Sequence, residues 1–107
     1  MKKCYAVYEE NLEYDEAFQK CAQILGTLAE PVNQMEIDAI QSEIQSKDNL
    51  HFIGVLNKTA EHCVAIDSKT GNWVLQNCSQ KLPFICQTRA SCKYKSKNFK
   101  FTNPSQL

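Results

Sequence analysis

The sequence predicts an α+β domain in which two helices pack on a small, mainly antiparallel sheet that disulfides hold together. Six cysteines occur in 107 residues, which is typical of a small domain from an oxidising compartment. Apolar residues recur at helical spacing in the first half of the chain, and short apolar runs separated by turn residues follow in the second half. The length is that of a single domain.

The first third of the chain is expected to form a short strand and then a helix. Cys4-Tyr-Ala-Val-Tyr8 has the composition of a strand, and the acidic residues 9–13 are interpreted as a turn. From Tyr14 to about Leu25, apolar residues fall three and four positions apart. The buried face of this helix is predicted to consist of Tyr14, Ala17, Phe18, Cys21, Ala22 and Leu25. Gly26 is expected to end the helix at its C′ position.

A second helix is predicted to begin at Asn33. Glu36 stands three residues later, which resembles the spacing of a capping box. Its inner stripe is expected to be Ile37, Ile40 and Ile44, and the polar residues 46–49 end it.

The second half of the chain is predicted to contain four strands. Phe52-Ile-Gly-Val55 is expected to be buried, and its glycine indicates a close approach of two backbones. Three further runs, residues 63–66, 73–75 and 84–86, are interpreted as an antiparallel meander with a hairpin turn at Gly71. Trp73 is expected to pack in the core from the centre of its strand, although its ring could also stack on a sugar.

Three disulfides are predicted. A bridge between Cys63 and Cys78 would join the two ends of the hairpin, and a bridge between Cys21 and Cys86 would join the first helix to the last apolar strand. Cys4 and Cys92 remain, and their bridge would connect the two ends of the chain. A structural zinc site is the alternative use of these cysteines, but no C-x-x-C pair occurs and the spacings are too wide for a zinc knuckle.

The net charge of zero hides an asymmetry between the two halves of the chain. Residues 1–54 carry four Lys and ten Asp or Glu, a net of −6, whereas residues 55–107 carry eight Lys or Arg and two acids, a net of +6. Each half could form a charged binding face, or both could be ordinary solvated surface. We expect a compact domain over residues 1–90 and a basic tail over 91–107, in which lysines alternate with aromatic residues. This tail is interpreted as a frayed terminus or an added edge strand.

Several motifs, taken in order, resemble the C-type lectin-like domain over Cys4 to Gln87. They are Cys4-Tyr5, the Tyr14 to Cys21 helix, Gly26-Thr-Leu-Ala29, Phe52-Ile-Gly-Val55 in place of Trp-Ile-Gly-Leu, His62-Cys-Val-Ala65, and Cys78 to Cys86 with Leu82-Pro-Phe-Ile. The resemblance implies the C-type lectin-like fold and the same pairings of Cys21 with Cys86 and of Cys63 with Cys78. Cys92 lies outside the matched region.

The departures from this family concern its calcium and sugar motifs. Only eight residues, Val55 to His62, separate Gly54 from Cys63, where calcium-dependent lectins of the family carry a long loop. Val74-Leu75 follows the tryptophan where those lectins have Asn-Asp, and apolar side chains cannot ligate calcium. The sugar-reading tripeptides are absent, and Glu30-Pro31-Val32, which looks similar to them, is interpreted as a tight turn. We therefore expect a compact, calcium-independent form of the domain with no metal or other cofactor.

No enzyme activity is predicted. His51 and His62 each precede a strand without a nearby nucleophile or a metal-ligand spacing, so we interpret both as solvated or strand-edge residues. No apolar run is long enough to span a membrane. The cysteines indicate a secreted protein or the extracellular portion of a membrane protein.

The predicted function is that of an extracellular recognition module that binds a protein ligand or receptor. The alternative is a lectin or polyanion binder that holds an anionic, glycosaminoglycan-like glycan through the basic half of the chain. A more remote alternative is a toxin-like secreted protein. Nucleic acid is not expected as a ligand. Asn57 begins an N-glycosylation sequon. The candidate ligand-binding residues are charged and aromatic side chains of the loop, the hairpin turn and the tail: Lys58, Glu61, Lys69, Lys93, Tyr94, Lys95, Lys97, Phe99 and Lys100.

Overall fold

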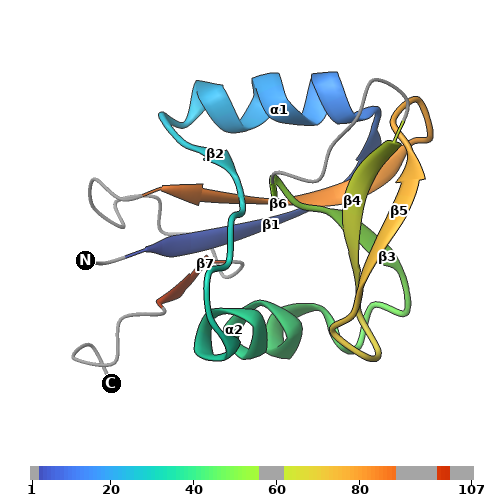
Figure 1. The fold of residues 1–107 in the computed structure, drawn as a ribbon. Helices are drawn as coiled ribbons and strands as arrows, with labels where there is room; N and C mark the ends of the chain where they lie inside the picture. Colours follow the sequence, from blue (N-terminus) through green and yellow to red (C-terminus); the bar gives the residue numbers. More distant parts are fainter. Residues whose placement is uncertain (1–2, 56–61, 89–98, 102–107) are drawn as a thin grey trace.

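A computed structural model describes residues 3–55, 62–88 and 99–101, the last three by their backbone only. Its elements follow the order β1 (Cys4–Leu12), α1 (Tyr14–Gln23), β2 (Thr27–Leu28), α2 (Gln34–Ile44), β3 (Leu50–Phe52), β4 (His62–Asp67), β5 (Trp73–Asn77), β6 (Leu82–Thr88) and β7 (Phe99–Phe101). The two helices lie on opposite sides of one sheet (Figure 1). The predicted α+β class, with two helices on a mainly antiparallel sheet, is confirmed.

The sheet is organised around β6. Within the described residues its strand order is β5-β4-β3-β6-β1-β7, and the short β2 also pairs with β6. β6 pairs antiparallel with β1 along one edge and shares its other edge between β2 and a single parallel bridge to β3, Phe52 to Phe84. The expected meander is therefore wrong in its third strand, because β6 lies between β3 and β1 rather than beside β5.

Alternation along the strands divides the buried residues into two clusters, one on each face of the sheet. Ala17 and Cys21 of α1 pack with Phe84 and Cys86 on one face. Ile40 and Ile44 of α2 pack with Ile85 on the other. Every residue of β6 is buried, because a helix covers each face of this strand.

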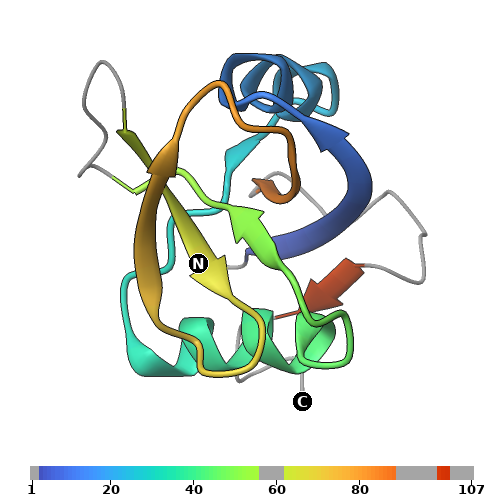
Figure 2. The ribbon, with the colours of Figure 1, turned by 90° about the vertical axis from the view of Figure 1, so that its right-hand side faces the viewer.

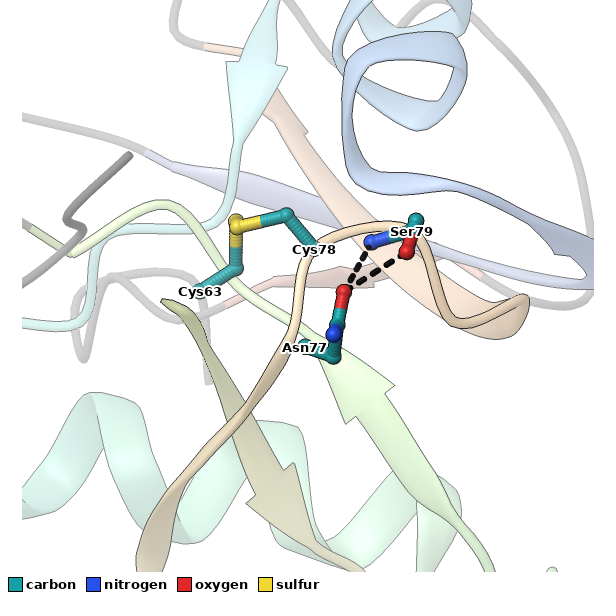
Figure 3. Close-up of a disulfide and its surroundings, with 4 residues drawn as sticks. All are labelled: Cys63, Asn77, Cys78 and Ser79. Atoms are coloured by element: carbon teal, nitrogen blue, oxygen red, sulfur yellow. Dashed lines mark hydrogen bonds between the residues drawn. A yellow bond between two sulfur atoms is a disulfide. The ribbon is translucent and has the colours of Figure 1, made fainter. Parts of the chain in front are cut away.

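Two disulfides link the described residues. Cys21–Cys86 joins α1 to β6, and Cys63–Cys78 joins the two ends of the β4–β5 hairpin (Figure 3). In the chain-entropy model, the loops of 65 and 15 residues that they close correspond to a stabilisation of roughly 4 and 3 kcal/mol. Cys4 is also disulfide-bonded, but Cys92 lies outside the described residues, so the predicted Cys4–Cys92 pair stays a prediction.

The turn after the hairpin is held by a side chain. Oδ1 of Asn77 accepts hydrogen bonds from the backbone N–H of Ser79 at 2.9 Å and from its hydroxyl at 2.7 Å (Figure 3). This is the local pairing by which Asn favours turns.

The first strand and helix differ from their predicted bounds. β1 continues to Leu12, so residues 9–13 are not a turn; the pairing with β6 shifts register between Tyr8 and Leu12. Helix α1 ends at Gln23, and Phe18 and Leu25, which were predicted to be buried, are 50% and 83% exposed. The N–H groups of Leu25 and Gly26 donate to the carbonyls of Ala22 and Cys21, which is the Schellman pattern with Leu25, at φ 61°, in the C′ position.

Two glycines are required by close packing rather than by helix capping. A Cβ on Gly26 would collide with the carbonyl of Gln87 on β6. A Cβ on Gly54 would lie 2.8 Å from the carbonyl oxygen of Leu28, which confirms the close backbone approach predicted there. These contacts hold the segment between the helices against the sheet.

The close approach at Gly54 predicts a stability defect in the Gly54→Ala variant. The added methyl group has only backbone and the Cβ of Leu28 around it, at 2.8 to 3.1 Å, so the backbone must shift. We expect a loss of about 1–3 kcal/mol in the free energy of unfolding, measured by urea denaturation. Ser46→Ala, at an exposed position after α2, is the control and should change the free energy by less than about 0.5 kcal/mol. Equal stabilities of the two variants would refute the packing argument.

Candidate functional site

Trp73 is a surface residue at the outer edge of the sheet. It begins β5, which pairs with β4 alone among the described strands, and its side chain is 39% exposed. The prediction that Trp73 packs in the core is therefore wrong. Its cross-strand neighbour on β4, Ile66, is fully buried, whereas Trp73 lies one strand farther from the centre of the sheet.

Trp73 separates two hollows. The first, which we call the Trp73 hollow, has a volume of about 290 Å³ and is lined by Glu30, Pro31, Val32, Gly54, Val55 and Trp73. The second, the amide hollow, has a volume of about 420 Å³ and lies between α2 and the hairpin turn; its lining is Gln34, Ile37, Gln41, Thr70, Gly71, Asn72 and Trp73. The first is mainly apolar with one carboxylate, and the second is lined by both polar and apolar side chains without a charged group.

An exposed apolar surface accompanies the Trp73 hollow. Val32 is 72% exposed, and Leu75, two residues after Trp73 and on the same face of β5, is 58% exposed. These residues come from segments far apart in the sequence. Their side chains offer an apolar contact surface beside a concave site, which is a common feature of protein-binding surfaces.

Backbone hydrogen bonds fix the wall of the Trp73 hollow that residues 29–32 form. The N–H of Gly54 donates to the carbonyl of Ala29 at 2.7 Å, and the N–H of Ala29 donates to the carbonyl of Ile85 on β6 at 2.8 Å. The N–H of Glu30 donates to Oε1 of Gln87 at 2.8 Å. Residues 29–32 are therefore an extended connection held against the sheet, and the interpretation of Glu30-Pro31-Val32 as a tight turn is wrong.

A nearly buried ion pair also holds this wall in place. Nζ of Lys3 lies 2.7 Å from Oε1 of Glu36, which also accepts a hydrogen bond from the N–H of Val32 at 3.0 Å. Burial opposes ionisation of Glu36, but the hydrogen bonds from Lys3, Val32 and Tyr5 together lower its pKa below the ordinary value. Asn33 caps α2 as predicted, since its side chain accepts from the N–H of Glu36. Glu36 itself bonds back to Val32 and so couples the helix start to the hollow.

Lys69, the one predicted ligand-binding residue whose side chain the structure describes, does not line the Trp73 hollow. Lys69 is exposed in the hairpin turn and lines a separate hollow with Asp48, Asn49, Leu50 and Asp67. Phe99 and Lys100 belong to β7, whose backbone pairs with β1, so this part of the tail adds an edge strand. The remaining candidates, together with the sequon residue, lie outside the described residues: Asn57, Lys58, Glu61, Lys93, Tyr94, Lys95 and Lys97.

The sequence offered only weak signals for the residues that do form the hollow. Trp73 and Leu75 alternate with Val74, so all three positions of the strand are apolar and no period-two pattern marks an exposed face. Which side of a strand faces solvent depends on its place in the sheet, and a sequence does not state this place.

The two histidines have different environments. His62 is exposed, but His51 is 0% exposed, so its interpretation as a solvated or edge residue is wrong. Nε2 of His51 lies 3.4 Å from a carboxylate oxygen of Glu9. Burial lowers the pKa of His51 below 6.5, although the carboxylate of Glu9 opposes this shift. Among the described residues no three His, Cys, Asp or Glu side chains gather in a metal-binding arrangement.

Comparisons with known proteins identify other proteins that share this architecture. The lectin C-type domain family matches residues 56–88 of the chain. A search of curated protein sequences finds no match. The structure is similar to that of convulxin, a snake venom toxin, with a TM-score of 0.72 and 19% sequence identity over 84% of this chain and 92% of that one.

Two further solved structures agree with this similarity. Botrocetin matches with a TM-score of 0.71 and 21% identity over 82% of this chain and 91% of that one. Human lithostathine matches with a TM-score of 0.70 and 21% identity over 81% and 83%. The chain therefore has the C-type lectin-like fold, as the sequence resemblance implies. It is a compact domain of that fold, with the Trp73 hollow on its surface. None of its described helices has the length and apolar character that a membrane crossing requires.

The buried His51 predicts that the stability of the domain decreases in mild acid. The unfolded chain binds a proton near pH 6.5, whereas the folded protein binds it only at lower pH, so the stability is complete above 6.5 and falls as the pH decreases toward the folded-state pKa. Urea denaturation at a series of pH values from 7.5 to about 5 should reveal this decrease.

Two variants distinguish this effect from general acid sensitivity. In His51→Gln the decrease between these pH values should be smaller, whereas in His62→Gln, at an exposed position, it should persist. A wild-type stability that stays constant down to pH 5 would contradict the lowered pKa.

Proposed function

We propose that this chain is an extracellular recognition module that binds a protein ligand without calcium, through the apolar surface around Trp73. The observation that carries the proposal is the grouping of Val32, Trp73 and Leu75 as exposed apolar residues beside a concave site. Aromatic residues that fill or border such sites supply much of the binding energy in protein interfaces.

Similar structures support a protein as the ligand. Botrocetin, which shares the fold, is found in a complex with a von Willebrand factor A1 domain, and rhodocetin, another match, is found in a complex with an integrin α2 A domain. At 19–21% identity these proteins share the fold with this chain, and they illustrate that the scaffold can present a protein-binding surface.

The side chains that follow Trp73 support binding without calcium. Val74 is half-buried against the core and Leu75 is exposed, and neither offers an oxygen atom to a hard cation. The proposed role is one of binding without catalysis, and the disulfides favour an extracellular location.

Binding of an anionic glycan through the basic residues of the second half is the alternative that the sequence supports. Residues 93–97 lie outside the described part of the chain, so this alternative depends on the sequence alone. It predicts retention on heparin that decreases with rising salt and when residues 93–101 are removed.

The first test is a screen of the wild-type protein against an array of extracellular protein domains, followed by affinity measurements with variants. Replacing Trp73 by Ala should weaken binding to the identified ligand by at least about tenfold, because the variant loses an aromatic side chain that the ligand would bury. Phe18→Ala is the matched control, because the ring of Phe18 is 50% exposed but belongs to α1 on the opposite side of the sheet. The affinity of this variant for the ligand should equal that of the wild type. A screen without any protein ligand, combined with strong binding to a glycan array, would overturn the proposal.

Calcium independence has its own test. The affinity for the identified ligand and the melting temperature should be the same in calcium and in EDTA, since the proposed surface uses no metal ligand. A calcium-dependent increase in either quantity would show that this part of the proposal is wrong.

A further inference from the structure

We propose that the Trp73 hollow receives an arginine or lysine side chain of the ligand, with the cationic group placed between the ring of Trp73 and the carboxylate of Glu30. This inference rests on the proposed function in one respect, namely that a protein ligand carries the cation. It adds the chemistry by which that ligand is recognised.

The walls of the hollow suit the aliphatic part of such a side chain. Pro31, Val32 and Val55 supply apolar surface, and the hollow has a volume of about 290 Å³. Lysine and arginine carry a stem of methylene groups that packs on apolar surface while the charged end reaches a polar partner. A hollow of this composition can therefore hold the stem and leave the charge at its rim.

Trp73 supplies an aromatic ring beside these walls. Its side chain is 39% exposed, so part of the indole is open to a ligand. Tryptophan is the aromatic side chain that attracts cations most strongly through the face of its ring. No Lys, Arg or His is found among the described residues that line the hollow, so no cation of the described chain occupies this place.

Glu30 provides a negative charge that has no ion-pair partner in the described part of the chain. It is half-buried, and its carboxylate forms no salt bridge or hydrogen bond with another described residue. Lys3 donates to the backbone carbonyl of Glu30 and pairs with the carboxylate of Glu36 instead. Burial raises the pKa of Tyr14 above its ordinary value, and the negative charge of Glu30 raises this pKa further.

The position of Glu30 is fixed before any ligand arrives. Its N–H donates to Gln87 at 2.8 Å and its carbonyl accepts from Lys3 at 2.9 Å, so both backbone groups are bonded. A site whose backbone is already ordered loses less conformational entropy when it binds.

The combination of groups selects a cation over other ligand groups. A purely apolar side chain would cover Glu30 and leave its carboxylate without compensation, which is costly in a partly buried place. An anionic side chain would be repelled. A basic side chain satisfies the carboxylate, the ring and the apolar walls together, and the planar guanidinium of arginine also stacks on an indole.

The test uses two small probes that have similar shape and differ in charge, N-acetyl-argininamide and N-acetyl-citrullinamide. Trp73 is the single tryptophan of the chain, so the ¹⁵N-labelled protein gives one indole N–H resonance from this place. Trp73 also lines the amide hollow, so the Glu30→Gln variant described below assigns the shift to the Trp73 hollow. We expect the arginine probe to shift this resonance saturably, with a dissociation constant in the millimolar range, and the citrulline probe to bind at least about fivefold more weakly. Binding of the arginine probe should weaken as salt is added.

Two variants locate the charge that the probe recognises. Glu30→Gln should weaken the arginine probe by about two- to fivefold and remove most of the difference between the probes. Glu43→Gln is the matched control, because Glu43 is also half-buried and forms no contact with the hollow, and it should bind as the wild type does. Equal shifts with both probes, an absence of any shift, or an unchanged affinity in Glu30→Gln would each overturn the proposal.

This experiment separates the two proposals. If a protein ligand is bound through Trp73 but the arginine probe does not bind, the inference is wrong and the proposed function stands. If the arginine probe binds as expected but no protein ligand is found, the hollow is a site for cations and the proposed function fails.

Discussion

The burial of β6 on both faces is the constraint on which the rest of the structure depends. All seven residues of this strand are buried, and β1, β2 and β3 form hydrogen bonds along its two edges. A strand without a solvent-facing side needs apolar cover above and below, so the two helices must lie on opposite faces of the sheet (Figure 2). The Cys21–Cys86 disulfide makes one of these contacts covalent.

Burial decreases with distance from β6, and this gradient creates the candidate binding surface. Four of the six residues of β4 are buried, whereas no residue of β5 is. Residues 29–32 approach the outer part of the sheet because Gly54 permits close backbone contact with Leu28. Trp73 and Val32 therefore meet at the margin of the core, where they are held in place but remain accessible.

The polar interactions around the hollow show how an apolar site is kept in a defined shape. Glu36 accepts from Lys3 and from the N–H of Val32, so a buried charge pair fixes the chain next to the site. Such a pair contributes little net stability once its desolvation is counted, but it specifies one backbone position. Glu30 differs because its carboxylate has no such partner among the described residues, and this difference makes it a candidate for contact with a ligand.

Local chemistry was sufficient to predict a large part of the fold from the sequence. The N-cap at Asn33, the inner stripe at Ile40 and Ile44, and the close approach at Gly54 depend on residues near one another in the chain or on the small size of one residue. The cysteine pairings followed because few arrangements can join a helix to a sheet and close a hairpin.

The same reasoning was wrong about residues whose exposure depends on the order of the strands in the sheet. Trp73 is exposed because β5 is an edge strand, and His51 is buried because β3 lies inside the sheet; both facts depend on strand order. Leu25 adopts the left-handed conformation, and the Gly26 that follows it packs against the carbonyl of Gln87 on β6. The sequence by itself determined the class of fold, the helix starts and the Cys21–Cys86 and Cys63–Cys78 disulfides, since these arise from residue spacing and residue chemistry. Only the tertiary structure decided which apolar residues face solvent and form the Trp73 hollow, because exposure depends on neighbours that are distant along the chain.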